Sequence, residues 1–303
     1  MRAGLLAHRS SISLSLGCGC RRTDLVAAPF GVTLRAMNGG GVDDGAAPGD
    51  EIVMRGGWMT GGVVRIGDTI RRPVGPWTPA VHALLRYLED VGFEGAPRVL
   101  GFDESGREVL TYLPSDPTPA WSDAALIATA RLVRQLDEAL AGFIPPPDAV
   151  WRLPPTGRHT PNGHIGHNDL CPMNTVYAGG RPYAFIDWDL AGPCRPLEDV
   201  TYTAICFVAI RPDRFWPRPG CPEPPNRVAR LRLFCDAYGI EDRLGFLDAI
   251  EALLRDQLNE TVELGARGVW PHHMLLARGE DRFRRMELEW LASNRTSLED
   301  ALR

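Results

Sequence analysis

Two short segments of this chain concentrate the polar side chains that could do chemistry. The first reads HNDLCPMN from His167 to Asn174, and the second reads FIDWD from Phe185 to Asp189. Between them an apolar run, an Ala-Gly-Gly-Arg turn and a second apolar run give the pattern of a β-hairpin. A hairpin returns the chain antiparallel, so Asn174 at its entrance and Asp187 at its exit should lie together.

Asn174 and Asp187 both offer hard oxygen ligands. A carboxylate and an amide oxygen, completed by waters and phosphates, are a usual way of holding Mg²⁺. Asp169 lies five residues before Asn174 on the same loop, where it could accept a proton from a substrate hydroxyl while a metal ion holds phosphates. The predicted chemistry is phosphoryl transfer, with Asp169 as catalytic base and Asn174 and Asp187 as magnesium ligands.

A zinc-dependent hydrolase is a competing hypothesis, because His159, His164, His167 and Asp169 lie close together in the sequence. Zinc sites use defined ligand spacings such as H-E-x-x-H or H-x-H-x-D, and the spacing here fits neither well. The hypothesis also leaves the predicted magnesium ligands without a purpose, and we reject it.

The elements that must position these groups change in character along the chain. From Glu51 to Pro114, short strands surround one helix. Apolar residues at helical spacing predict a helix that opens at Pro79 and ends at Gly92. Turn residues and apolar runs predict the strands Val63–Ile66, Thr69–Arg72, Arg98–Gly101 and Glu108–Leu113.

After Pro119 the chain becomes mostly helical, and Ser122 is a plausible N-cap for a helix that runs to Leu140. Further helices are predicted at Asp199–Ile210, Val228–Tyr238, Arg243–Leu264 and Gly279–Ser293. The expected fold class is α+β and bilobal. Its parts are a disordered extension over residues 1–49, a small strand-rich nucleotide-binding lobe over 50–114, and a larger helical lobe over 115–303 that carries the catalytic loop, the metal site and the acceptor site.

The order H-x-D-x-x-x-x-N, hairpin, I-D-W resembles the catalytic and metal loops of the aminoglycoside phosphotransferase and choline-kinase-like family. The segment AGPCRPLEDV over residues 191–200 is also similar, and it implies that Asp199 braces the catalytic loop. The resemblance implies a protein-kinase-like fold that uses Mg²⁺ and ATP or GTP to phosphorylate a small-molecule hydroxyl, on an aminoglycoside or another polar metabolite. His167 would orient the loop by hydrogen bonding. The family usually has glycine where Asn168 stands, so we expect a different backbone setting there.

The resemblance also implies a glycine-rich loop over the phosphates, and Gly61 and Gly62 precede the first hairpin strand at the matching place. The family has a lysine or arginine on the third strand, but this chain contains no lysine. Strand alternation sends only one of two neighbouring arginines inward, and we expect Arg71, with Arg72 as the alternative.

The connector strand that ends in Tyr112 and Leu113 should supply backbone groups to adenine. The following helix of the small lobe departs from the family pattern, because the positions that should present a glutamate to the basic residue hold Val81 and His82. The missing glutamate and lysine favour a second hypothesis, a non-catalytic nucleotide-binding pseudokinase. The presence of the base and both metal ligands argues against it.

Composition excludes some partners. The net charge is −5 without a long basic run, which is not the footprint of a nucleic-acid binder, and no apolar stretch is long enough to span a membrane. The seven cysteines are odd in number and scattered, which predicts a reducing compartment and a cytoplasmic protein. Residues 160–303 hold 21 acidic side chains against 17 arginines, a mild excess that suits a cationic acceptor.

We predict that residues 1–36 are dispensable, because they lack a periodic apolar pattern. A chain that starts at Met37 should fold and show the same thermal melting curve as the full chain. A substantial fall in melting temperature would contradict this prediction, since it would mean that the extension packs against the rest.

Overall fold

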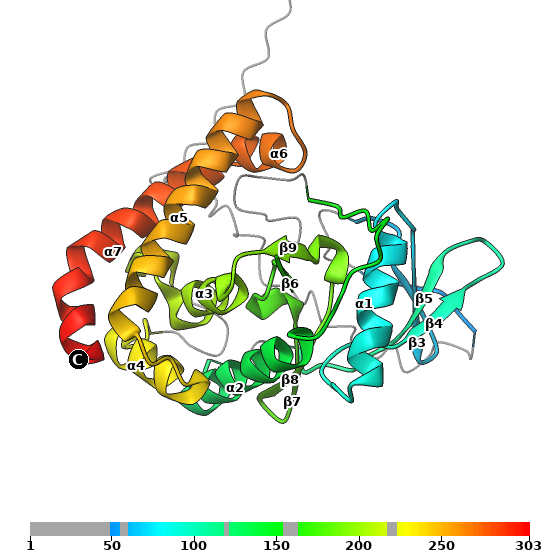
Figure 1. Cartoon of the computed structure of the whole chain (residues 1–303), viewed down its shortest axis with the longest axis horizontal. Helices are drawn as coiled ribbons and strands as arrows, with labels where there is room; N and C mark the ends of the chain where they lie inside the picture. Colours follow the sequence, from blue (N-terminus) through cyan, green and yellow to red (C-terminus); the bar gives the residue numbers. More distant parts are fainter. Residues whose placement is uncertain (1–48, 55–59, 118–120, 154–162, 217–222) are drawn as a thin grey trace, which may run out of the picture.

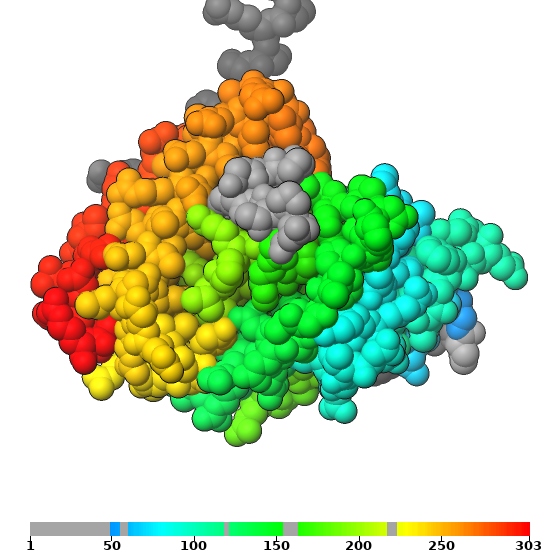
Figure 2. Space-filling model, in the orientation of Figure 1, coloured from blue at the N-terminus to red at the C-terminus, as the bar shows by residue number. Residues whose placement is uncertain are grey.

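The computed structural model describes residues 49–54, 60–117, 121–153, 163–216 and 223–303. The predicted extension therefore lies outside the described residues, apart from Gly49. The strand-rich part of the chain, blue to cyan, occupies one side of the molecule, and the C-terminal helices, yellow to red, occupy the other (Figures 1 and 2). Segments from the middle of the sequence lie between them. This arrangement is the predicted α+β, protein-kinase-like architecture.

The small lobe is built on a five-stranded antiparallel sheet with the order β1-β2-β3-β5-β4. Its strands are β1 (Ile52–Val53), β2 (Val64–Ile66), β3 (Thr69–Arg72), β4 (Val99–Phe102) and β5 (Glu108–Thr111). One helix, α1 (Thr78–Asp90), packs beside the sheet and buries Leu84, Leu85 and Leu88, as its apolar spacing predicts. The predicted hairpin and helix are confirmed, whereas β1 is too short for its sequence to show alternation.

The large lobe is mainly helical and holds two short antiparallel strand pairs, β6 with β9 and β7 with β8. Its elements are α2 (Asp123–Leu140), β6 (His164–Gly166), β7 (Thr175–Ala178), β8 (Arg181–Phe185), β9 (Gly192–Cys194), α3 (Glu198–Ala204), α4 (Arg227–Tyr238), α5 (Arg243–Ala266), α6 (His272–Ala277) and α7 (Glu280–Leu302). The side chain of Ser122 caps α2 by accepting the N–H of Ala125, as predicted. No helix among the described residues could cross a membrane.

Several elements of the large lobe differ from the sequence prediction, and α7, for example, runs to Leu302 where Ser293 was expected. The helix α6 was not predicted, because six residues are too few to show a helical repeat. The predicted helix Asp199–Ile210 ends as an α-helix at Ala204 and continues as a π-helical turn over Ile205–Ala209. π-helical turns are uncommon and often lie at functional sites, and this one follows directly on α3.

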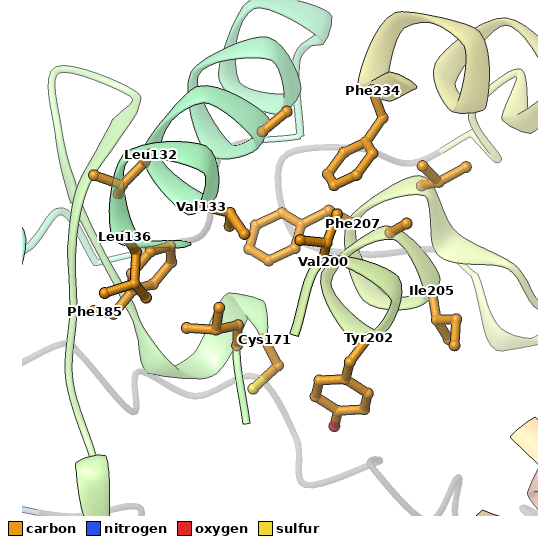
Figure 3. Packing of buried hydrophobic residues seen from close by; sticks show 14 of the residues in the cluster. Leu132, Val133, Leu136, Cys171, Phe185, Val200, Tyr202, Ile205, Phe207 and Phe234 are labelled. Atoms are coloured by element: carbon orange, nitrogen blue, oxygen red, sulfur yellow. The ribbon is translucent and has the colours of Figure 1, made fainter. Parts of the chain in front are cut away.

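The hydrophobic core centres on α2 (Figure 3). Val133 and Leu136 of this helix are fully buried and belong to one cluster with Phe185 of β8, Phe207 of the π-helical turn and Phe234 of α4. Burial of each side chain of this size stabilises the fold by roughly 1.5–3 kcal/mol. Because Phe185 stands two residues before Asp187, this packing holds the end of the hairpin in place.

The segment that connects the lobes runs along the same hairpin. The N–H of Asp116 donates to the carbonyl of Tyr177 at 2.7 Å, and the hydroxyl of Tyr183 donates to the carbonyl of Pro114 at 2.5 Å. From the small lobe, the carbonyl of Gly95 accepts the N–H of Phe185 at 2.9 Å. The hairpin that carries the predicted metal ligands is therefore bonded to both lobes.

Candidate active site

The loop between β6 and β7 is braced by one carboxylate of α3. Asp199 accepts the backbone N–H of His167 at 2.5 Å and that of Asn168 at 2.7 Å. Gly166 makes room for this contact, because a Cβ atom there would lie 2.6 Å from Oδ2 of Asp199. Burial raises the pKa of Asp199 to about 7 against the lowering effect of the two N–H groups. The carboxylate thus sets the direction in which the loop leaves β6.

Asn168 occupies the left-handed backbone region at φ 65°, which glycine adopts most easily. The expectation that asparagine would need a different backbone setting is therefore wrong. Asparagine tolerates this region better than most residues. Its Nδ2 also donates to the carbonyls of Leu190 at 3.0 Å and Gly192 at 3.2 Å, which ties the catalytic loop to the segment after the hairpin.

Asp169 projects from this loop between two hydrogen-bond donors. Nδ2 of Asn174 donates to its Oδ2 at 2.8 Å and to its carbonyl at 3.0 Å, and the hydroxyl of Tyr202 donates to its Oδ1 at 3.3 Å. Burial and, second, the negative charge of Asp187 raise the pKa of Asp169 to about 7. Tyr202 was missed from the sequence, where it reads only as part of a helix.

His167 is fully buried beneath the loop. Its Nε2 lies 3.0 Å from the carbonyl of Ile186, and its ring centroid lies 4.5 Å from that of Trp188. Burial lowers the pKa of His167 to about 4, so the imidazole is neutral at neutral pH. The residue joins the catalytic loop to the segment that holds Asp187, in agreement with an orienting role.

The hairpin brings Asn174 and Asp187 to the same end, as its antiparallel course requires. The N–H of Ile186 donates to the carbonyl of Asn174 at 2.8 Å. Asp187 follows in the left-handed region at φ 62°, and its side chain is 37% exposed. Burial raises the pKa of Asp187, and the charge of Arg72 acts in the opposite direction.

This donor set fits Mg²⁺ that also binds phosphates. Because Nδ2 of Asn174 is engaged by Asp169, the amide oxygen is the group left for a cation. The carboxylate of Asp187 is the second oxygen donor. Across the described residues, no group of three or more His, Cys, Asp or Glu side chains could hold a metal ion. A site with only two protein donors suits Mg²⁺, which keeps several waters and takes substrate phosphates as ligands.

Asp189, two residues beyond Asp187, is a buried junction. Its Oδ2 lies 2.6 Å from Nη2 of Arg72 and 2.5 Å from Nη1 of Arg152, and it accepts the hydroxyl of Thr60 at 2.8 Å. Thr60 and Arg72 belong to the small lobe. This single carboxylate oxygen therefore connects three segments that are far apart in the sequence.

The sequence expectation that Arg71 is the inward arginine is wrong, and the alternative, Arg72, takes this position. Arg72 is buried and also lies 3.4 Å from Asp187, whereas Nε of Arg71 lies 3.7 Å from Asp103 in the β4–β5 turn. Burial acts to lower the pKa of Arg72, but the charges of Asp189 and Asp187 outweigh it and raise that pKa. As strand alternation requires, only one of the two arginines points inward. It is Arg72, because Arg72 and its strand partner Glu108 lie on the face of the sheet that α1 covers.

Arg152 was not predicted, because it stands in a proline-rich segment without regular structure. Its guanidinium lies 4.4 Å from the ring centroid of Trp77, at the start of α1, and 4.5 Å from that of Trp270. Such contacts hold a cation by its attraction to the ring faces. Burial lowers the pKa of Arg152, and Asp189 opposes this effect. The side chain fills the space between the two lobes and points its Nη1 at Asp189.

Two of the predicted nucleotide contacts have a clear place in the structure. Gly61 and Gly62 follow Thr60 directly, so they lie next to the carboxylate of Asp189. The N–H of Tyr112 donates to the carbonyl of Asp68 at 2.9 Å, because the β3–β5 ladder continues past the last strand residue. The carbonyl of Tyr112 is therefore the backbone group that this residue could offer to adenine.

Comparisons with known proteins find relatives of this chain in sequence and in fold. The model of the phosphotransferase enzyme family matches residues 77–242. The trifolitoxin immunity protein of Rhizobium leguminosarum bv. trifolii is 38% identical over 212 residues, which cover 66% of this chain and 79% of that protein. Among solved structures, a choline/ethanolamine kinase family protein from Mesorhizobium loti has a TM-score of 0.53 at 17% identity, covering 86% of this chain and 94% of that chain. The ternary complex of APH(2″)-IIa with streptomycin and ATP has a TM-score of 0.50 at 12% identity, covering 80% of this chain and 93% of that chain. At these identities the two structures show a shared fold.

We predict that Asp199→Ala lowers the free energy of unfolding by roughly 2–6 kcal/mol, because two buried N–H groups lose their acceptor at about 1–3 kcal/mol each. Urea unfolding followed by circular dichroism measures the change. Asp90→Ala, at an exposed position near the end of α1, is the matched control and should stay within about 0.5 kcal/mol of the unchanged chain. Equal losses in the two variants would contradict the bracing role.

Proposed function

Because the chain belongs to the phosphotransferase enzyme family, we propose that it transfers the γ-phosphoryl group of ATP or GTP to a hydroxyl of a small polar molecule. The observation that carries the proposal is the meeting of Asp169, Asn174 and Asp187 at one end of the β7–β8 hairpin. Asp169 and Asn174 are in direct contact, and the hairpin ladder places Asp187 beside them.

Asp169 is the proposed general base. As the acceptor oxygen forms its bond to phosphorus, the hydroxyl proton passes to the carboxylate, and the bond between phosphorus and the nucleotide oxygen breaks. Asn174 and Tyr202 hold the carboxylate in place for this step. A pKa of about 7 suits the task, since a general base works best when its pKa is near the working pH.

Asn174 and Asp187 are the proposed ligands of Mg²⁺. When bound, the cation neutralises negative charge on the phosphate oxygens. Asp187 is accessible enough to be a ligand, and its nearest described cation is Arg72 at 3.4 Å, a long contact that can be given up.

Arg72 and Arg152 are the proposed phosphate-binding cations. The loop with Thr60, Gly61 and Gly62 would cover the phosphates, and the backbone of Leu113 would contact adenine. Guanidinium groups bind phosphate oxygens through two parallel N–H bonds, so arginine can fill a role that lysine usually has. Both arginines already lie at the oxygen of Asp189. That carboxylate would keep the two charges close together and oriented before the nucleotide arrives.

This geometry supports an enzyme over the pseudokinase alternative. The alternative drew on the missing lysine and the missing helix glutamate. Arg72 lies beside the candidate metal ligand Asp187 and could take the role of the missing lysine. Its pairing with Glu108 of the same sheet could take the place of the missing helix glutamate.

Charge and kinship suggest which acceptors to test. A cationic aminoglycoside or amino alcohol suits the mild acidic excess of the large lobe. Because one relative is named as an immunity protein against trifolitoxin, that toxin belongs beside aminoglycosides, macrolides, choline, sugars and nucleosides in a panel. The test is acceptor-stimulated release of ADP by the purified protein. ATP binding without stimulation by any compound would favour the pseudokinase.

We predict that Asp169→Ala lowers turnover by on the order of 10²–10⁴-fold, because the proton acceptor is lost. Nucleotide binding should be kept, because the backbone carbonyl of residue 169 still accepts Nδ2 of Asn174. A coupled ADP-release assay and calorimetric titration with Mg²⁺-ATP measure the two quantities. Asp90→Ala serves as the control. A fully active Asp169→Ala variant would show that the base has been assigned to the wrong residue.

We also predict that Asp187→Ala abolishes the tightening of nucleotide binding by Mg²⁺, because water cannot replace a fixed negative ligand. Titrations with ATP, carried out with Mg²⁺ and with a chelator, should differ for the unchanged chain and coincide for the variant. Undiminished dependence on Mg²⁺ in the variant would place the metal elsewhere.

A further inference from the structure

The inward arginine of β3 has a carboxylate directly across the sheet. Arg72 and Glu108 are register partners in the β3–β5 ladder, so their side chains leave the same face of the sheet. Glu108 is 4% exposed, and its Oε1 lies 3.1 Å from Nε of Arg72 as an ion pair rather than an aligned hydrogen bond. Because both strands belong to one ladder, the separation of the two backbones is set by the sheet.

The second oxygen of Glu108 contacts helix α1. Oε2 lies 2.8 Å from Nε2 of His82, which is 2% exposed. The ring of His82 also lies 5.3 Å from the ring of Phe102 on β4, between centroids. His82 therefore holds Glu108 from the side opposite to Arg72, and the three residues form one buried array from helix to strand to strand.

Helix α1 has no carboxylate of its own at this place. Its acidic residues are Glu89 and Asp90, and both are exposed at its C-terminal end. The helix glutamate that the family pattern leads one to expect is thus absent, and Glu108 of β5 stands beside the arginine instead.

Charge explains why Arg72 needs a partner on the sheet side. Its Nη2 lies near Asp189 and Asp187. Without Glu108, these two carboxylates would be the nearest counter-charges of a buried guanidinium, which must be paired. Arg72 would then be drawn onto Asp187 and would compete with a cation for it. Glu108 balances the charge of Arg72 at Nε. Nη2 of Arg72 can then give up Asp187 and bind a phosphate oxygen instead.

We infer that Glu108 is a positioning residue for phosphate binding by Arg72, and that His82 positions Glu108. This inference rests on the proposed function, because it assumes that the ligand of Arg72 is the phosphoryl donor. By this inference, α1 contributes only indirectly to phosphate binding. Since arginine and carboxylate lie on neighbouring strands, the sheet register keeps their backbones together, and the helix orients the carboxylate through His82.

The experiment is calorimetric titration of the full chain with Mg²⁺-ATP. Glu108→Gln keeps the shape and loses the charge, and it should weaken binding by roughly 10–100-fold, as loss of a buried orienting group does. His82→Gln should weaken it in the same direction by less. Glu104→Gln, an exposed glutamate of the β4–β5 turn, is the matched control and should bind like the unchanged chain.

A double-mutant cycle separates positioning from general stability. If Glu108 acts through Arg72, the Arg72→Gln/Glu108→Gln variant binds Mg²⁺-ATP no more weakly than Arg72→Gln alone. Additive losses would overturn the inference. A Glu108→Gln variant that melts earlier but binds with unchanged affinity would overturn it too, since the role would be structural.

Should Glu108→Gln not fold, His82→Gln decides, and its unchanged affinity for Mg²⁺-ATP would refute the array. A failure of the proposed function has a different signature, because the unchanged chain itself would then not bind Mg²⁺-ATP, and the inference would be refuted with it.

Discussion

A buried charge must have a partner of opposite sign, and this requirement organises the space between the two lobes. Asp189 is the clearest case. One of its oxygens accepts a hydrogen bond from Thr60 and forms ion pairs with Arg72 of the small lobe and Arg152 of the large one. Leaving any of these ions unpaired in the interior is strongly unfavourable. The contacts of Asp189 therefore fix the distance between the two lobes, and this distance in turn sets how far Arg72 lies from the candidate metal ligand Asp187.

The absence of lysine shapes how this requirement is met. A guanidinium is planar and always charged, and it is held through its faces as well as its N–H groups. Arg152 uses both, because its guanidinium lies over the rings of Trp77 and Trp270 while Nη1 contacts Asp189. Arg72 is held by carboxylates instead. The two arginines are thus held at the same carboxylate by different contacts, and both are the proposed ligands of the nucleotide phosphates.

Unfavourable backbone is concentrated at the residues that aim the functional side chains. Four non-glycine residues in the described part of the chain have positive φ. Three of them, near 65°, are Asn168, Asp187 and Leu197, and the fourth, Ala209, ends the π-helical turn. Such conformations persist only where surrounding contacts impose them. Asn168 precedes the candidate base, Asp187 is the candidate metal ligand, and Leu197 opens the helix that carries Asp199. The hydrogen bonds from His167 and Asn168 to Asp199 supply the compensating contacts.

Local sequence determined the parts of this protein that depend on short-range order. The spacing from Asp169 to Asn174, the hairpin and Asp187 predicted which groups meet, because a hairpin closes on itself wherever it lies in the fold. Apolar periodicity likewise predicted α1, α2 and the order of lobes. The identity of the side chains was enough to suggest phosphoryl transfer, and the family match agrees with it.

Tertiary structure alone decided which residues complete the site. Either face of β3 could have been inward, and the choice of Arg72 over Arg71 follows from where α1 packs. Glu108 and Arg152 lie 36 and 80 residues from Arg72 in the sequence and meet the site only through sheet register and lobe contact. Residues brought together over such separations leave no pattern in the chain, because their partnership is set by the packing of whole elements and not by spacing along the backbone.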